Sequence, residues 1–135
     1  MNEIVKISTN KDIISSLCEF LKKNLKFDAS PKLRFLINKK NEKDCFGKTA
    51  FYDPEEQTIS IYISGRHIKD ILRSIAHETV HHAQNCRGEF DKMSSATEGY
   101  AQTNPHLREM EKEAYLTGNI MFRDFEDSAK YVKRK

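Results

Sequence analysis

The sequence predicts a single α+β domain in which helices flank a short antiparallel β-sheet. Apolar residues recur at three- and four-residue steps in some segments and alternate at every second residue in another, which are the periods of helix and strand. The chain of 135 residues is long enough for one core of ordinary size and too short for two. We expect residues 1–125 to form this domain and residues 126–135 to form a basic C-terminal tail.

The N-terminal helix is expected from Lys11 to about Leu25. Small polar residues precede it, as is typical of N-caps, and its apolar residues share one side at helical spacing. Asp28–Pro31 then interrupts the helix, because proline and small polar residues favour turns. Leu33–Asn38 is the first predicted strand.

The next two strands are expected to pair as an antiparallel hairpin. They are Phe46–Tyr52 and Thr58–Ser64, and the segment between them begins with Asp53-Pro54, a sequence typical of turns. Three isoleucines alternate with Ser, Tyr and Ser in the second strand, so one face of the sheet is apolar and half-buried.

Two longer helices are predicted after the hairpin. The first runs from about His67 to Cys86 with one apolar stripe, and Gly88 suits its C-terminal stop. Glu89–Thr103 is a polar loop. Pro105 suits the first turn of the last helix, which is expected to run to about Phe122. The tail beyond Phe122 is expected either to continue the helix or to fray.

Charge and cysteine content narrow the class of protein. The 23 basic and 20 acidic residues give a net charge of +3, and no basic face accompanies the basic tail, so nucleic acid is not an expected partner. The three cysteines are Cys18, Cys45 and Cys86, which form no Cys-x-x-Cys pair and favour free thiols in the cytoplasm. No segment approaches the ~20 apolar residues of a membrane span, so no membrane contact is expected.

The motif that carries chemistry is His77-Glu78-Thr79-Val80-His81, within the helix predicted from His67 to Cys86. Residues four apart on a helix lie one turn apart on the same side, so both imidazoles can reach one metal ion. Glu78 can then face a metal-activated water as general base. On a helical projection the pair points away from the apolar stripe. His82 lies beside the stripe and is expected to be a buried, hydrogen-bonded histidine.

A zinc peptidase site needs a third protein ligand and an open fourth position. The third histidine of the metzincin pattern is absent, because Arg87 occupies its place. Glu111 lies in the middle of the apolar face of the last helix, where a carboxylate needs a cation or hydrogen bonds. It is our preferred third ligand, with Glu113 as the reserve and His106 as the only downstream histidine. Glu109 is expected to be a solvated surface carboxylate.

His77–His81 followed by Glu111-Lys-Glu-Ala114 resembles the gluzincin plan of His-Glu-x-x-His plus Glu-x-x-Ala. Small gluzincins and ImmA/IrrE-type regulatory peptidases share this plan, and the hairpin resembles the sheet edge before their active-site helix. The resemblance spans roughly residues 46–118 and implies a zinc-dependent peptidase with Zn²⁺ on His77, His81 and Glu111 and with Glu78 as catalytic base. Many gluzincins carry an aspartate four residues after the ligand glutamate, where Tyr115 stands here.

The sequence therefore favours a zinc metallopeptidase that acts on a protein or peptide. Tyr100, Tyr115 and His106 are the candidate donors to the oxyanion of the transition state. The strand Thr58–Ser64 is a candidate for pairing with an extended substrate if it is the edge of the sheet. The main alternative is a catalytically weak or inactive zinc-binding module that acts through a regulatory protein partner.

Two weaker alternatives use other parts of the chain. A nucleic-acid accessory protein would use Lys130–Lys135, but the sequence lacks the basic, aromatic-laced face of such proteins. A deformylase-like hydrolase would need an upstream cysteine ligand, and the strand-like flanks of Cys45 do not favour that role.

Overall fold

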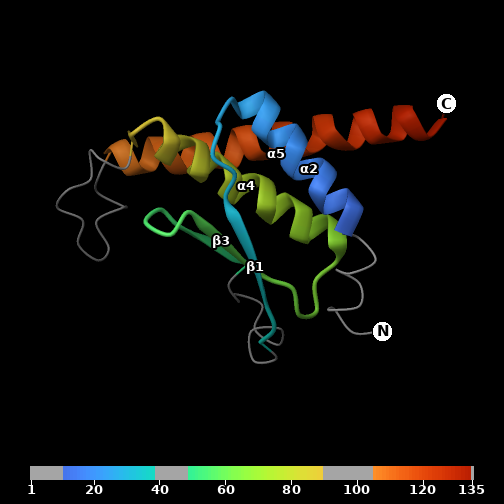
Figure 1. Cartoon of the computed structure of the whole chain (residues 1–135), viewed down its shortest axis with the longest axis horizontal. Helices are drawn as coiled ribbons and strands as arrows, with labels where there is room; N and C mark the ends of the chain where they lie inside the picture. Colours follow the sequence, from blue (N-terminus) through green and yellow to red (C-terminus); the bar gives the residue numbers. More distant parts are fainter. Residues whose placement is uncertain (1–10, 39–48, 90–104, 135) are drawn as a thin grey trace.

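The computed structural model describes residues 11–38, 49–89 and 105–134, with side chains described as far as residue 128. In chain order the elements are α2 (Lys11–Leu25), β1 (Lys32–Leu36), β2 (Ala50–Asp53), β3 (Thr58–Tyr62), α4 (Ile68–Cys86) and α5 (Pro105–Arg134). The described elements are three helices and one three-stranded sheet, so the predicted α+β class is confirmed. Figure 1 shows the helices gathered beside the sheet. The start of the predicted hairpin, most of the predicted polar loop, Cys45 and Tyr100 lie outside the described residues.

The sheet is mixed, with strand order β1-β3-β2. The predicted hairpin is confirmed, because β2 pairs antiparallel with β3 and places Tyr52 opposite Ile59. The expectation of an antiparallel sheet is wrong for the other pair, since β1 runs parallel to β3 with Phe35 opposite Ile61. The alternation of side chains along β1 is compatible with pairing in either direction. The direction is decided by how the chain connects the strands, which the residues of β1 do not encode.

Because β3 is the central strand, it does not meet the condition for pairing with an extended substrate, which was that it lie at the edge of the sheet. Both of its sides are paired, one with β1 and the other with β2. Within the described part of the chain, β1 and β2 are the edge strands.

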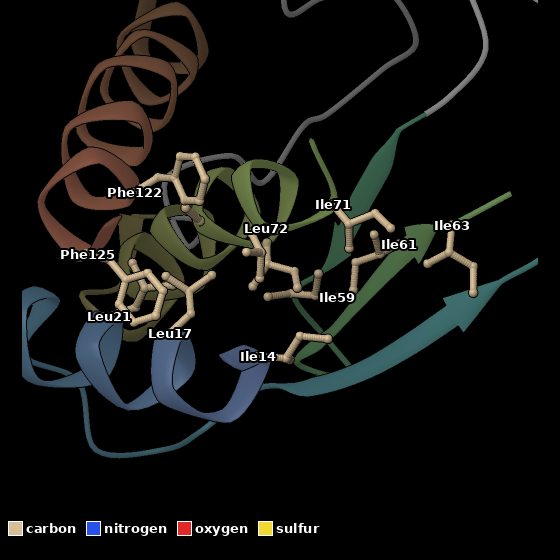
Figure 2. Close-up of a cluster of buried hydrophobic side chains, with 12 residues drawn as sticks. Ile14, Leu17, Leu21, Ile59, Ile61, Ile63, Ile71, Leu72, Phe122 and Phe125 are labelled. Atoms are coloured by element: carbon tan, nitrogen blue, oxygen red, sulfur yellow. The ribbon is translucent and has the colours of Figure 1, made fainter. Parts of the chain in front are cut away.

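The core lies between one face of the sheet and the three helices. Figure 2 shows that α2, β3, α4 and α5 all contribute buried side chains to it. Its buried residues include Leu17, Leu21, Ile59, Ile61, Ile71, Leu72, Ile75, Phe122 and Phe125. Helix α4 packs against the sheet, α2 and α5, so the helix that carries the histidine motif is held on several sides.

The ends of α4 follow from local capping. The side chain of His67 accepts a hydrogen bond from the backbone N–H of Lys69 at 3.1 Å and so caps the first turn. At the other end Gly88 adopts a φ of 82°, a left-handed conformation that favours glycine, as predicted for the helix stop.

Helix α5 runs past Phe122 to Arg134, so the tail continues the helix, which is one of the two outcomes expected for it. Its apolar face continues past Phe122, because Phe125 is buried and its ring packs edge-on to that of Phe20 at a centroid distance of 5.7 Å. The segment expected to be a tail therefore continues the helix through residue 134 (Figure 1). None of the described helices combines the length and the apolar character that a membrane crossing requires.

His82 confirms the prediction of a buried, hydrogen-bonded histidine. It is 0 % exposed, its Nε2 donates to the carbonyl oxygen of Ala29, and its Nδ1 accepts from the hydroxyl of Tyr52 at 2.7 Å. Asn85 donates to the same hydroxyl at 3.0 Å. Burial lowers the pKa of His82, so the ring is neutral and can accept from Tyr52. This network ties β2 to α4 and to the loop after α2.

The network predicts that Tyr52→Phe destabilises the fold. The change removes the hydroxyl donor to His82 and the acceptor for Asn85, and leaving a buried polar group unpaired costs about 1–3 kcal/mol. Urea unfolding should show this loss. Tyr62→Phe, which removes a hydroxyl of the neighbouring strand outside the network, should stay within about 0.5 kcal/mol of wild type. Equal losses in the two variants would contradict the role of the network.

Candidate metal centre

Three of the predicted ligands converge at the contact between α4 and α5. His77, His81 and Glu111 each offer one ligand atom, and these atoms lie within 4.8 Å of one another. Nε2 of His81 is 2.6 Å from Oε1 of Glu111, and Nε2 of His77 is 3.7 Å from Oε2 of the same carboxylate. Two imidazole nitrogens and a carboxylate oxygen are a common donor set for zinc and related divalent metals, so this group could hold a metal ion.

Helix α4 presents the histidines to a cleft on the side away from the apolar core. The side chain of His81 is 11 % exposed, whereas that of His77 is 27 % exposed. The cleft has a volume of about 870 Å³. Residues of β2, α4 and α5 line it, including Ala50, Phe51, Tyr52, Ser74, His77, Glu78, His81, Met110, Glu111 and Tyr115. The prediction that His77 and His81 point away from the apolar stripe is therefore confirmed, and both side chains line the cleft.

Glu111 does not lie where the sequence placed it on α5. Its side chain is 61 % exposed, so it is not in the middle of the buried face. The buried residues of that face recur at helical spacing and are Met110, Ala114, Gly118, Phe122 and Phe125. The face therefore begins at Met110, one position before Glu111. Glu111 lies at the margin of this face, next to the cleft, where it reaches both histidines and remains accessible.

The separation of α4 and α5 is set by a glycine. A Cβ added to Gly118 would lie 3.0 Å from Cα of His77 and 3.2 Å from its backbone nitrogen. Both atoms belong to the main chain of α4 and cannot move aside without moving the helix. Gly118 therefore allows the close approach of α5 to α4 that places Glu111 beside the histidines.

The charges of the group are coupled. Hydrogen bonds with His77 and His81 hold the pKa of Glu111 well below its usual range. Burial alone would lower the pKa of His81, but its hydrogen bonds to Glu111 and Gln84 outweigh this effect and raise the pKa. A metal ion would compete with protons for these imidazoles, so its binding should weaken in acid.

Glu78 lies next to the ligand group without belonging to it. Its side chain is 11 % exposed, and its Oε2 is 4.0 Å from Nε2 of His77. Burial raises the pKa of this carboxyl above its ordinary value. Glu78 also lines the cleft.

The other candidate ligands are engaged elsewhere. Glu113 accepts hydrogen bonds from Gln84 at 2.7 Å and from Arg87 at 2.7 Å. His106 contacts the carbonyl oxygen of Glu89 at 3.0 Å and lines a second, smaller pocket. Among the alternatives for the third ligand, the structure therefore brings Glu111 to the two histidines.

The candidate donors to a transition state are separated by the fold. Tyr115 is 65 % exposed on α5 and lines the main cleft, whereas His106 does not line it. Tyr100 lies outside the described residues.

Sequence reasoning missed Gln84, which is 0 % exposed and contacts Nδ1 of His81 at 2.8 Å. One signal was available, because a residue three positions after His81 lies on the same side of the helix. A polar side chain in that place is a candidate partner for the ring.

Comparisons of the chain with models of protein families, with curated proteins and with solved structures give no match. The resemblance to gluzincins therefore rests on the motif at His77–His81 and on Glu111. What the structure supports directly is an α+β fold with a candidate metal centre of two histidines and one glutamate.

The first prediction from this geometry concerns Gly118→Ala. Glycine to alanine inside a helix ordinarily stabilises it by about 0.5–1 kcal/mol, but here the added Cβ meets the backbone of His77. We expect the overpacked helix pair to lose about 1–3 kcal/mol in thermal or urea unfolding and to bind zinc more weakly. The exposed change Ser128→Ala on the same helix is the control. A stabilised Gly118→Ala protein would contradict the close contact.

The second prediction concerns metal content. Purified protein supplied with zinc should carry about one zinc per chain by mass spectrometry, as a three-ligand site with an open position implies. His81→Ala and Glu111→Ala should lose it. Glu109→Ala, which changes an exposed carboxylate on the same helix, should keep it. Zinc retained in Glu111→Ala would exclude this residue as the third ligand.

Proposed function

We propose that this protein is a zinc-dependent peptidase that hydrolyses peptide bonds in a protein or peptide substrate. The observation that supports it most is the convergence of His77, His81 and Glu111 beside the buried carboxyl of Glu78 in an open cleft. Zinc is proposed from ligand type, since imidazole nitrogens with one carboxylate are a frequent set in catalytic zinc sites.

The roles of the chain's own residues follow from their places. Zinc held by a His₂Glu set acts as a Lewis acid toward a water molecule and a substrate carbonyl. Glu78 would accept the proton of the attacking water on its carboxylate and return it to the leaving amine. A buried position with a raised pKa suits both steps, because the group must take up a proton and also release it. Tyr115 remains the candidate donor to the carbonyl oxygen, since it lines the same cleft.

The substrate is proposed to bind along β2. Ala50, Phe51 and Tyr52 line the cleft, and within the described residues β2 has β3 as its partner on one side. An extended peptide added to the other side would gain main-chain hydrogen bonds and run past the histidine pair. This assigns to β2 the role that the sequence suggested for the strand Thr58–Ser64.

The remaining parts of the proposal follow the sequence. Cys18 and Cys86 are free thiols, in agreement with the cytoplasmic location that we propose. The alternative function, a zinc-binding module that acts through a protein partner without catalysis, would use the same metal centre.

The test is hydrolysis of an unstructured protein such as casein by zinc-loaded protein, with the products identified by mass spectrometry. Glu78→Gln should retain zinc and lose about 10²–10⁴-fold in turnover, since it cannot take up the proton. Glu109→Gln serves as the matched control and should keep wild-type activity.

Two outcomes would count against the proposal. Equal turnover in Glu78→Gln and wild type would exclude this residue as the base. A wild type that binds zinc and cleaves no substrate would favour the non-catalytic binding module.

A further inference from the structure

Gln84 is a fully buried amide, 0 % exposed, between the two helices of the candidate metal centre. It lies on α4 one turn after His81. Its Nε2 donates to the carbonyl oxygen of Met110 at 2.9 Å and to Oε1 of Glu113 at 2.7 Å, both on α5. Its Oε1 contacts Nδ1 of His81 at 2.8 Å.

The partners of Gln84 determine which way its amide points. A backbone carbonyl and a carboxylate both accept hydrogen bonds, and Arg87 lies 2.7 Å from the same oxygen of Glu113 and favours its ionised form. The NH₂ group of Gln84 must therefore face α5, and its oxygen must face His81. An oxygen can only accept, so the proton on that side of the ring belongs to Nδ1.

A proton held on Nδ1 leaves Nε2 of His81 as the metal-binding nitrogen. This is the nitrogen that lies 2.6 Å from Glu111. Met110 and Glu113, the two α5 partners of Gln84, lie one residue before and two residues after Glu111. One amide therefore contacts a ligand on α4 and the turn of α5 that carries another ligand.

We infer that Gln84 is a positioning residue of the metal centre, which holds the His81 ring with Nε2 toward the metal and ties that ring to the α5 turn of Glu111. The inference rests on the metal-binding part of the proposed function and deepens it. Groups that hydrogen-bond the far nitrogen of a metal-bound histidine fix its orientation, and their loss typically weakens metal binding by about 10–100-fold. Tyr115, one turn after Glu111, is 65 % exposed and has no carboxylate that could orient a ligand histidine.

The experiment compares Gln84→Met with wild type in two measurements. Methionine keeps the length of the side chain and removes all three hydrogen bonds. Zinc affinity, measured by competition with a chromophoric chelator, should fall about 10–100-fold. In NMR spectra of the zinc-loaded protein, the Nδ1 proton of His81 should be protected from exchange in wild type and lost in the variant.

Thr79→Val is the matched control. It removes the buried hydrogen bond from Oγ1 of Thr79 to the carbonyl oxygen of Ile75, at 2.6 Å, which involves neither histidine. It should change stability and leave both the zinc affinity and the Nδ1 proton signal as in wild type. A fall in zinc affinity equal to that of Gln84→Met would overturn the assignment, because any loss of helix stability would then explain both.

A pair of double variants separates the acceptor of Gln84 from its volume. Gln84→Glu with Glu113→Gln keeps an oxygen acceptor for His81 and an amide donor from α5 to the carboxylate at position 84, whereas Gln84→Met with Glu113→Gln keeps neither. Both double variants lose the hydrogen bond to the carbonyl oxygen of Met110, so this loss does not distinguish them. The first should bind zinc more tightly than the second. Equal affinities would show that the oxygen facing His81 is not what matters.

The outcomes are distinct. Zinc affinity unchanged in a folded Gln84→Met overturns the assignment to Gln84 and leaves the metal site standing. If Gln84→Met does not fold, wild type decides, since metal on Nδ1 of His81 or an unprotected Nδ1 proton overturns it. A wild type that binds no zinc overturns the proposed metal site, and this inference with it.

Discussion

The close packing of α5 on α4 is the constraint on which the candidate site depends. His77 and His81 come together through helical spacing alone, but Glu111 joins them because α5 runs alongside α4 within reach of the ring nitrogens. Gly118 permits this approach at the backbone of His77, two turns along α5 from the carboxylate. The apolar residues on the same face of α5 hold the two helices together. The packing of the core therefore also sets the distance from Glu111 to the two histidines.

Polar contacts then hold the parts of the site against the core. The Tyr52–His82 hydrogen bond ties the edge strand β2 to α4 on one side of the helix. Gln84 ties α4 to α5 on another side through Met110 and Glu113. Both links depend on buried side chains of α4 that immediately follow the histidine motif, and each connects α4 to an element that lines the cleft.

Features encoded by local spacing could be predicted from the sequence. The bounds of α2 agree with the prediction, and α4 begins within one residue of it, because both helices carry one clear apolar stripe. The pairing of the histidines and the burial of His82 also follow from positions around a single helix. Glu111 was selected from the right helix. The prediction placed it in the middle of the buried face, whereas the structure buries the preceding residue, Met110, and leaves Glu111 at the margin.

Features that depend on a distant partner could not be predicted in this way. The parallel direction of β1 depends on the chain route between strands, and the alternation of its residues is the same in either direction. The contacts of Gln84 and Glu113 require the register of α5 against α4, which the pattern of either helix alone does not contain. The extension of α5 past Phe122 follows from Phe125, whose apolar partner Phe20 lies on α2.

The division of the ligands between α4 and α5 gives a bound metal ion the character of a cross-link. It would bind the docked pair of helices and not the separated ones, so the binding free energy would add to the docking of α5 by mass action. At a free metal concentration 100 times Kd this contribution is about 2.7 kcal/mol. Removal of the metal would withdraw this contribution from the contact between α4 and α5 and leave the apolar contacts of Phe122 and Phe125 to hold α5. In such a protein, occupancy of the metal site and the stability of the contact between the two helices would rise and fall together.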